Sequence, residues 1–276
     1  MPHNSPRNRI SLAIALLVCA TAAGVVLVSR TGDGSPTTVA TPPPTTSAAT
    51  KAVPERAAPS VSIHRQHPHT LTTAKVAYWA VVLKPARAFA KPSSAARVLT
   101  TLPAMTSDRT QNIVQVVATE IVAPHASWYR VRLAILPNNS LGWVPRAALG
   151  RVYTVHTHLY VDLEGTTATL KRNGVTIFKT IIGVGKSATP TPRGQFYIRD
   201  ELTDFHNPFY GPVAFGTSAR SATLTDWPNG GFIGVHGTDT PAILPGRVSH
   251  GCVRMPNASI LTLARLMPVG TPVTIT

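Results

Sequence analysis

The sequence predicts a mainly β protein that follows a non-globular N-terminal segment. The chain has 276 residues with 25 Pro and 19 Gly, a content typical of short strands joined by turns, and its 43% hydrophobic residues suffice for a packed core. The formal net charge is +15, yet only 13% of residues are charged, which excludes a charge-dense disordered chain. No run of five or six basic residues appears, so we expect no nucleic-acid partner.

Residues 10–28 form an apolar run of 19 residues without a charge, with Arg7 and Arg9 before it and Arg30 after it. Such a run is long enough to cross the ~30 Å hydrocarbon core, and the basic flank places its N-terminal side in the cytoplasm. We therefore expect residues 1–30 to be a signal anchor or transmembrane segment in the cell membrane, with the rest outside the cytoplasm. The alternative is a cleaved signal peptide, with small residues at 20–22 as the cleavage site and a secreted product.

Residues 31–74 are rich in Pro, Thr, Ala and Ser and contain almost no large apolar side chain. This composition cannot form a core and indicates a disordered linker that lets the following part stand away from the membrane.

Residues 75–150 carry β-type runs at 76–83, 97–102, 113–121, 128–133 and 141–144, separated by turn formers. The pattern Trp-Tyr-Arg-Val at 128–131, a turn, and Gly-Trp-Val-Pro at 142–145 resembles the last hairpin of bacterial SH3-like domains. The resemblance implies a small β-barrel that acts as a binding module or as a spacer beside a cell-wall enzyme. The alternative is a domain that only packs and binds no ligand.

Residues 151–276 are predicted to form a second β domain, with strands at 158–163, 167–172, 175–184 and 271–276. Asn173-Gly174 is a two-residue hairpin turn. Asn257 is expected to cap a helix with apolar residues at 260, 263, 264 and 267, ended by Pro268. The Gly-, Pro- and aromatic-rich stretch 200–231 is expected to be a lid.

Cys252 is the one cysteine outside the apolar run, so an exported chain has no partner for it. A lone thiol is either an inert core residue or a nucleophile, and a nucleophile needs a base or a cation beside it. Two histidines qualify as the base: His250, which shares a strand face with Cys252, and His236, 16 residues upstream. Gly251 permits close approach of a substrate, and nearby amides are candidate oxyanion donors. A zinc site is the alternative, but no carboxylate stands at a suitable spacing, so we expect no metal.

Four motifs resemble the catalytic domain of YkuD-type L,D-transpeptidases. They read Asn-Pro-Phe-Tyr-Gly-Pro at 207–212, Phe-Gly-Thr at 215–217, Ile-Gly-Val-His-Gly-Thr at 233–238, and Ser-His-Gly-Cys-Val-Arg-Met at 249–255. Thr-Pro-Thr-Pro-Arg-Gly at 189–194 also matches a typical segment of the family. The resemblance covers most of residues 151–276 and implies a mixed β-sandwich without cofactor or metal.

The resemblance also implies the roles of the site residues. Cys252 is the expected nucleophile and His236 the general base and later acid, oriented by a backbone carbonyl. Ser249, His250 and Gly251 are expected to support the thiolate and the oxyanion. Arg254 either contacts a substrate carboxylate or ties down the motif loop. The expected substrate-binding residues are Tyr210, Gly234, Gly237 and Trp227, and the stretch 200–231 also contains the aromatic residue Phe205.

The implied activity is cross-linking of peptidoglycan stem peptides through a cysteine thioester, by a monomer that carbapenem-type β-lactams acylate. Two alternatives remain: an L,D-carboxypeptidase that uses water as acceptor, and a wall-binding anchor protein with a degenerate catalytic domain.

Overall fold

The computed structural model describes residues 68–123, 126–203, 207–225 and 231–276, all of which belong to one compact unit. The predicted membrane segment and most of the predicted linker lie outside these residues. Within the described part, none of the helices has the length and apolar character of a membrane-crossing segment.

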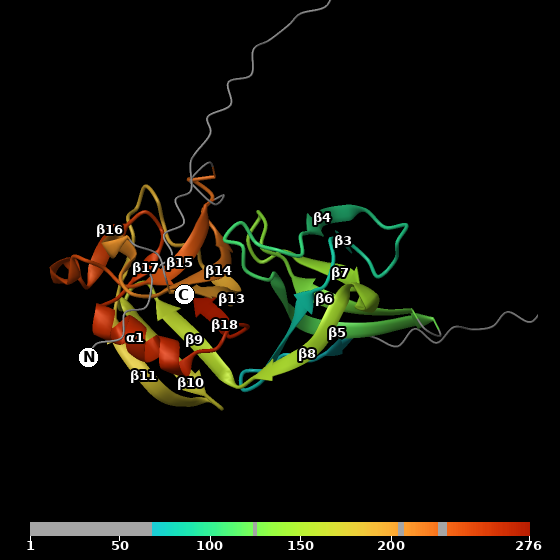
Figure 1. Cartoon of the computed structure of the whole chain (residues 1–276), viewed down its shortest axis with the longest axis horizontal. Coiled ribbons are helices and arrows are strands. Elements are labelled where there is room, and N and C mark those ends of the chain that lie inside the picture. The colour runs from blue at the N-terminus through green and yellow to red at the C-terminus, as the bar shows by residue number, and fades with distance from the viewer. Residues whose placement is uncertain (1–67, 124–125, 204–206, 226–230) are drawn as a thin grey trace, which may run out of the picture. The chain divides into compact units, whose positions relative to one another are not determined.

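The first sheet has the strand order β4-β3-β7-β6-β5-β2-β8, with β1 paired to β5. Antiparallel pairing joins every neighbouring pair in it, as the labels of Figure 1 allow the reader to follow. Its strands are β1 (His69–Thr70), β2 (Ala77–Val82), β3 (Ala86–Phe89), β4 (Val98–Leu102), β5 (Ile113–Ala123), β6 (Ala126–Arg132), β7 (Leu141–Pro145) and β8 (Leu149–Val155), and a 3-10 turn, η1 (Arg146–Ala148), precedes β8.

The second sheet is mixed and has the order β11-β10-β9-β18-β13-β14-β15-β17-β12-β16. Three of its pairs are parallel: β9 with β18, β15 with β17, and β12 with β16. Its strands are β9 (Thr157–Asp162), β10 (Thr167–Arg172), β11 (Val175–Ile181), β12 (Gly183–Gly185), β13 (Gly194–Leu202), β14 (Ala214–Arg220), β15 (Phe232–His236), β16 (Gly246–Ser249), β17 (Val253–Arg254) and β18 (Pro272–Ile275). The loops of the described part include the 3-10 turns η2 (Pro208–Tyr210) and η4 (Pro241–Ile243).

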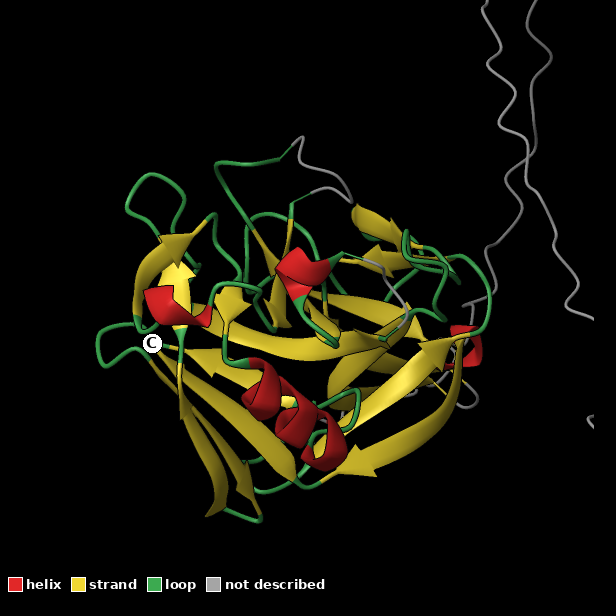
Figure 2. Cartoon of the chain, turned by 60° about the vertical axis from the view of Figure 1, so that its left-hand side comes forward, coloured by secondary structure: helices red, strands yellow, loops and turns green. Residues whose placement is uncertain are grey.

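The helix α1 (Asn257–Leu266) lies along the β10 and β11 side of the second sheet (Figures 1 and 2). Ser259 Oγ is 2.8 Å from Thr180 Oγ1 of β11, and Arg172 of β10 donates to the Leu266 carbonyl. Ile260 and Leu263 are fully buried and join the core formed by the inward residues of the strands, because they lie on one helical face.

The strand and turn predictions are largely confirmed. All five strands expected in residues 75–150 are present within two residues at their ends, and so are those expected from residues 158, 167, 175 and 271. Asn173 and Gly174 both have positive φ, 52° and 85°, as a tight hairpin of this kind requires. Residues 175–184 form two strands, β11 and β12, rather than one.

Several features differ from the prediction. The strand β3 was missed, and β8, which runs through the predicted boundary at 150/151, pairs with β2 of the first sheet. The end of the predicted linker forms β1, because the edge of β5 offers unpaired backbone groups to it. The expected lid at 200–231 is not one loop, since β14 and the end of β13 occupy much of it. Asn257 is the first helical residue rather than the cap.

The backbone at Gly270 gives a test of the packing. Gly270 has a φ of +80°, and a Cβ there would collide with the Trp79 indole. At Gly174, with a φ of +85°, a Cβ would make only an ordinary van der Waals contact, 3.7 Å, with the Lys75 side chain. Gly174→Ala should therefore lower the free energy of unfolding by about 1–2 kcal/mol, the cost of the left-handed backbone alone. Gly270→Ala should lower it by about 1–3 kcal/mol more, because of overpacking. Urea denaturation measures both values, and equal losses would contradict the Trp79 contact.

Candidate active site

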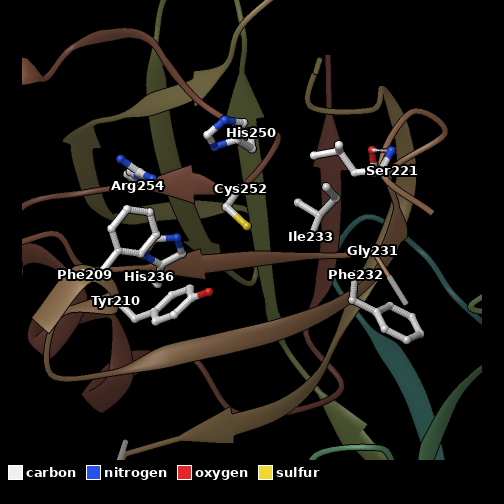
Figure 3. A pocket seen from close by; sticks show the side chains of 11 residues that line it. Phe209, Tyr210, Ser221, Gly231, Phe232, Ile233, His236, His250, Cys252 and Arg254 are labelled. Carbon is white, nitrogen blue, oxygen red and sulfur yellow. Dashed lines mark hydrogen bonds between the residues drawn. The ribbon is translucent and has the colours of Figure 1, made fainter. Parts of the chain in front are cut away.

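The parallel pairing of β15 with β17 brings the two chemical motifs together. Val235 pairs with Val253 and His236 with Arg254, so Cys252 lies beside the strand that carries His236. Together they line one pocket (Figure 3). Its lining residues are Phe209, Tyr210, Ser221, Leu224, Gly231, Phe232, Ile233, His236, His250, Cys252 and Arg254.

The Cys252 sulfur accepts a hydrogen bond from a backbone amide. The Gly234 N–H donates to Sγ over 3.3 Å. Burial raises the pKa of the Cys252 thiol, while this amide and the nearby Arg254 charge oppose the rise. The thiol therefore rests in its neutral form more readily than an exposed cysteine does.

The His236 imidazole is held in one orientation by the chain itself. The side chain is 1% exposed, and its Nδ1 lies 2.6 Å from the Gly237 carbonyl oxygen. A carbonyl only accepts, so Nδ1 carries the proton and Nε2 presents a lone pair. Nε2 is buried and has no hydrogen-bond partner among the described residues. The backbone carbonyl expected to orient His236 is thus present.

Burial lowers the pKa of His236 to about 4, helped by the Arg254 charge and opposed by the Gly237 hydrogen bond. The imidazole is therefore neutral at pH 7, and its free nitrogen is able to accept a proton. Burial thus disfavours the charged forms of both Cys252 and His236.

Gly234 lies between the His236 imidazole and the Cys252 thiol, and its lack of a side chain leaves both groups facing the same space. A Cβ at this position would lie 3.6 Å from His236 Cδ2 and 3.7 Å from Cys252 Sγ. Cδ2 is bonded to Nε2, so the free nitrogen and the sulfur lie on the same side of β15. The Tyr210 ring meets the imidazole edge-on at 5.0 Å between centroids, and Figure 3 shows both rings beside the sulfur.

A second layer holds Gly237. The Thr238 N–H donates to Asn257 Oδ1 over 2.9 Å. A Cβ at either Gly237 or Gly211 would collide with the same oxygen, so Asn257 packs directly against both glycines. Gly237 is buried behind His236 and is absent from the pocket lining, whereas its carbonyl acts on the imidazole.

The loop before Cys252 is tied together by Ser249. Its Oγ donates to the Cys252 carbonyl over 2.6 Å and accepts from the Gly251 N–H over 3.1 Å. The Gly251 amide is thereby engaged, although the sequence suggested it as an oxyanion donor. Gly251 has a φ of +119°, and Thr191 donates to its carbonyl over 2.7 Å.

The other predicted residues are placed as follows. His250 is exposed at the rim of the pocket, and residues 250–251 form a bend rather than an extended strand. Phe205 and Trp227 lie outside the described residues. Phe215 is fully buried in the core.

Arg254 is a buried cation beside the pocket. It is 7% exposed, its guanidinium carbon lies 4.2 Å from the centroid of the Phe209 ring, and its Nε has no partner among the described residues. Arg254 is therefore held by an aromatic face rather than by a carboxylate.

Sequence reasoning missed the site roles of Asn257, Phe209 and Thr191. Each lies in or next to a motif that the sequence singled out, but their contacts join segments far apart in the chain. Among the described residues, no group of three or more His, Cys, Asp or Glu is placed to hold a metal ion.

Comparison with known proteins identifies the family. Residues 156–275 match the family model of the YkuD L,D-transpeptidase catalytic domain. The Bacillus subtilis protein YkuD, named as an L,D-transpeptidase, is 38% identical over 123 residues, which cover 45% of this chain and 68% of that one. The protein of the same name from Bacillus licheniformis is 34% identical over 45% of this chain and 67% of its own length.

Among solved structures, an Enterococcus faecium L,D-transpeptidase variant is 25% identical, with a TM-score of 0.34, over 44% of this chain. The alignment spans about half the length of that protein, 49%. The family model and the two Bacillus relatives show that the domain that carries the thiol and the imidazole is an L,D-transpeptidase catalytic domain. The chain belongs to the YkuD family of L,D-transpeptidases.

The buried imidazole predicts a pH dependence of stability. The unfolded chain binds a proton at His236 below about pH 6.5, whereas the folded chain, with its pKa at about 4, does not. Stability should therefore fall as the pH falls from 6.5 to 4, with a His236 share of up to about 3 kcal/mol. Urea unfolding at pH 7.5 and 4.5 measures the loss. His236→Gln should lose less than the wild type over this interval; an unchanged loss would show that the imidazole titrates normally.

Proposed function

We propose that this protein is a peptidoglycan L,D-transpeptidase that works through a thioester on Cys252. The observation that carries the proposal is the pairing, inside the family's catalytic domain, of a lone thiol with a histidine whose tautomer leaves one buried nitrogen free. The acyl donor is the stem tetrapeptide, cut between its third and fourth residues. Family membership supports this substrate class.

In the first step His236 Nε2 takes the proton from Sγ as the sulfur attacks the carbonyl of stem residue three. Both groups are neutral at rest, so charge develops only as substrate binds and reacts. The Gly234 N–H supports the negative sulfur, and the Gly237 carbonyl supports the imidazolium through Nδ1–H. The Arg254 charge also favours the sulfur anion.

In the second step the tetrahedral intermediate collapses. The bond to the terminal D-alanine nitrogen breaks, Nε2–H protonates the departing amine, and a thioester remains on Cys252. An incoming amine then gives its proton to Nε2 and attacks the thioester carbonyl. The new amide forms, the carbon–sulfur bond breaks, and the proton returns from Nε2 to the thiolate.

The acceptor decides between a transpeptidase and a carboxypeptidase. Water as acceptor gives only a shortened stem, whereas an amine gives a cross-link. The pocket walls are mostly apolar, with Phe209, Ile233, Leu224 and Phe232 among them. Apolar walls hold water poorly, and this favours an amine acceptor.

Arg254 is proposed to act through its positive charge, on the two catalytic groups and on a substrate carboxylate. Its guanidinium has no carboxylate partner among the described residues and lowers the pKa of both Cys252 and His236. A carboxylate of the stem peptide is a suitable ligand for its planar fork. This reading fits a buried, unpaired cation better than a role in tying down the loop.

We further propose that residues 10–28 anchor the protein in the cell membrane and that the catalytic domain works outside the cytoplasm, in the wall. The charge pattern around the apolar run supports this placement. We also propose that the domain of the first sheet binds the cell wall or acts as a spacer between the membrane and the catalytic domain. The resemblance of its β6–β7 hairpin to SH3-like domains supports this role.

Replacing the nucleophile tests the proposed function. Purified protein is incubated with a tetrapeptide stem and an amine acceptor, and separately with a carbapenem. We expect a cross-linked product and a mass increase confined to the Cys252 peptide, by mass spectrometry. Cys252→Ala should reduce both by about 1000-fold or more, because no other thiol lies in the domain. Product formation by the Cys252→Ala variant would overturn the proposal. A shortened stem without a cross-link, formed by the unmodified protein, would assign the carboxypeptidase reaction.

Asn257 is predicted to be a positioning residue for His236. Asn257→Leu removes the acceptor of the Thr238 N–H and should lower kcat by about 10- to 100-fold with little change in KM, by analogy with other groups that orient a catalytic side chain. Asn257→Asp keeps the acceptor and adds a negative charge. It should recover part of kcat and move the acidic limb of the pH–rate profile upward, because a nearby carboxylate raises an imidazole pKa.

The control is Thr262→Ala, on the exposed side of the same helix. It should leave kcat unchanged. An equal loss of kcat in all three variants would show that α1 acts only through stability.

A further inference from the structure

A second cavity lies beside the active-site pocket and shares one wall with it. Phe232 lines both. We call this second space the arginine cavity, lined by Thr100, Thr101, Leu102, Pro103, Thr106, Ser107, Asn112, Val114, Ala134, Ile135, Tyr197, Arg199, Arg220 and Phe232. It contains neither the thiol nor the imidazole.

Two guanidinium groups share the Phe232 ring. The Arg199 carbon Cζ lies 4.1 Å from the ring centroid and that of Arg220 lies 4.8 Å from it. Figure 3 shows the Phe232 ring turned away from Cys252. Like charges this close repel, and the Arg199 charge indeed lowers the pKa of Arg220, after burial as the larger cause. An anion placed beside the two groups is attracted by both charges.

Arg199 is the unusual member. Its side chain is 7% exposed, and its Nε is buried without a hydrogen-bond partner among the described residues. Taking a guanidinium out of water is costly unless its N–H groups find acceptors. The ring face stabilises the charge but accepts no conventional hydrogen bond from its edge.

The carboxylates near Arg199 are already engaged. Asp200 accepts from the Gly216 N–H over 2.9 Å and from Thr110 Oγ1 over 3.3 Å. Burial raises the pKa of Asp200, and the Asp108 charge adds to the rise while Arg199 opposes it. Asp200 thus offsets part of the positive charge here without accepting a hydrogen bond from Arg199.

The neighbouring polar groups are either engaged or exposed. Tyr197 donates its hydroxyl to the Ile113 carbonyl, and Asn112 donates to the Pro103 carbonyl. Arg132 donates to Gln115 over 3.0 Å. Thr101 and Ser107, in contrast, are exposed on the lining and offer hydroxyl donors toward the cavity. The lining therefore combines cationic and hydroxyl donors, which suit an acceptor with several oxygens.

We propose that the arginine cavity binds an oxyanion, a carboxylate or phosphate group, through Arg199 and Arg220. The planar fork of a guanidinium matches either group. Such an anion completes the hydrogen bonding of Arg199 and places negative charge beside both guanidinium groups. Because Phe232 also lines the active-site pocket, an occupant of the cavity lies against a wall of that pocket.

The test measures the thermal stability of the full chain at pH 7 in sodium phosphate, sodium acetate or sodium chloride of equal ionic strength. A ligand that binds only the folded state raises Tm. At about ten times its Kd, phosphate or acetate should raise Tm by roughly 3 °C over chloride. The acetate and phosphate arms distinguish a carboxylate from a phosphate ligand, and no increase with either overturns the proposal.

Variants locate the site. Arg199→Gln should abolish the increase, whereas Arg87→Gln, at an exposed position of β3, should keep it. Arg254→Gln should keep it too, because that guanidinium belongs to the active-site pocket. Loss in Arg254→Gln with retention in Arg199→Gln would assign the anion to the active site and overturn the proposal.

If Arg199→Gln does not fold, Arg220→Gln replaces it. This partly exposed residue tolerates substitution more readily, and its loss should reduce the Tm increase by at least half. An undiminished increase in that variant would contradict the proposal.

Discussion

The hydrogen bond from His236 Nδ1 to the Gly237 carbonyl is the interaction on which the site depends. A buried imidazole without it could adopt either tautomer and either ring orientation. With it, Nε2 keeps its lone pair free, on the side of β15 that also faces the sulfur. The carbonyl belongs to the following residue, so the orientation holds only while that peptide is held. Asn257 does this through the Thr238 amide and its packing on Gly237.

Parallel pairing of β15 with β17 supplies the second constraint. Two residues 16 positions apart become neighbours because Val235 and Val253 are in register. Gly234 lies between them, and a Cβ there would contact both Cδ2 of the imidazole and Sγ, at 3.6 and 3.7 Å. Burial is the consequence of this close approach. Burial raises the pKa of the thiol and lowers the pKa of the imidazole. Both groups therefore stay neutral until a substrate binds and reacts.

The motifs around His236 and Cys252 could be read from the sequence because each combines reactive side chains with glycine over a few residues. Most strands could be read as well, since alternation and turn formers are local signals. The partners of those strands could not. Whether β8 belongs to the first or the second sheet depends on its hydrogen bonds with β2, and no pattern within residues 149–155 encodes that choice. Asn257 was misread for the same reason: an Asn before an apolar helix suggests a cap, but its acceptor serves Thr238 in a distant loop.

Arg254 and Arg199 are stabilised in the same way, by an aromatic ring in place of a carboxylate. Each is 7% exposed, each lies over a phenylalanine ring at 4.1–4.2 Å, and each has an Nε without a partner among the described residues. A carboxylate partner would neutralise such a cation and remove it from further use. An aromatic face stabilises the charge and leaves the N–H edge free to meet an anion. Packing of these two cations on phenylalanine is therefore better suited to ligand recognition than to structural pairing.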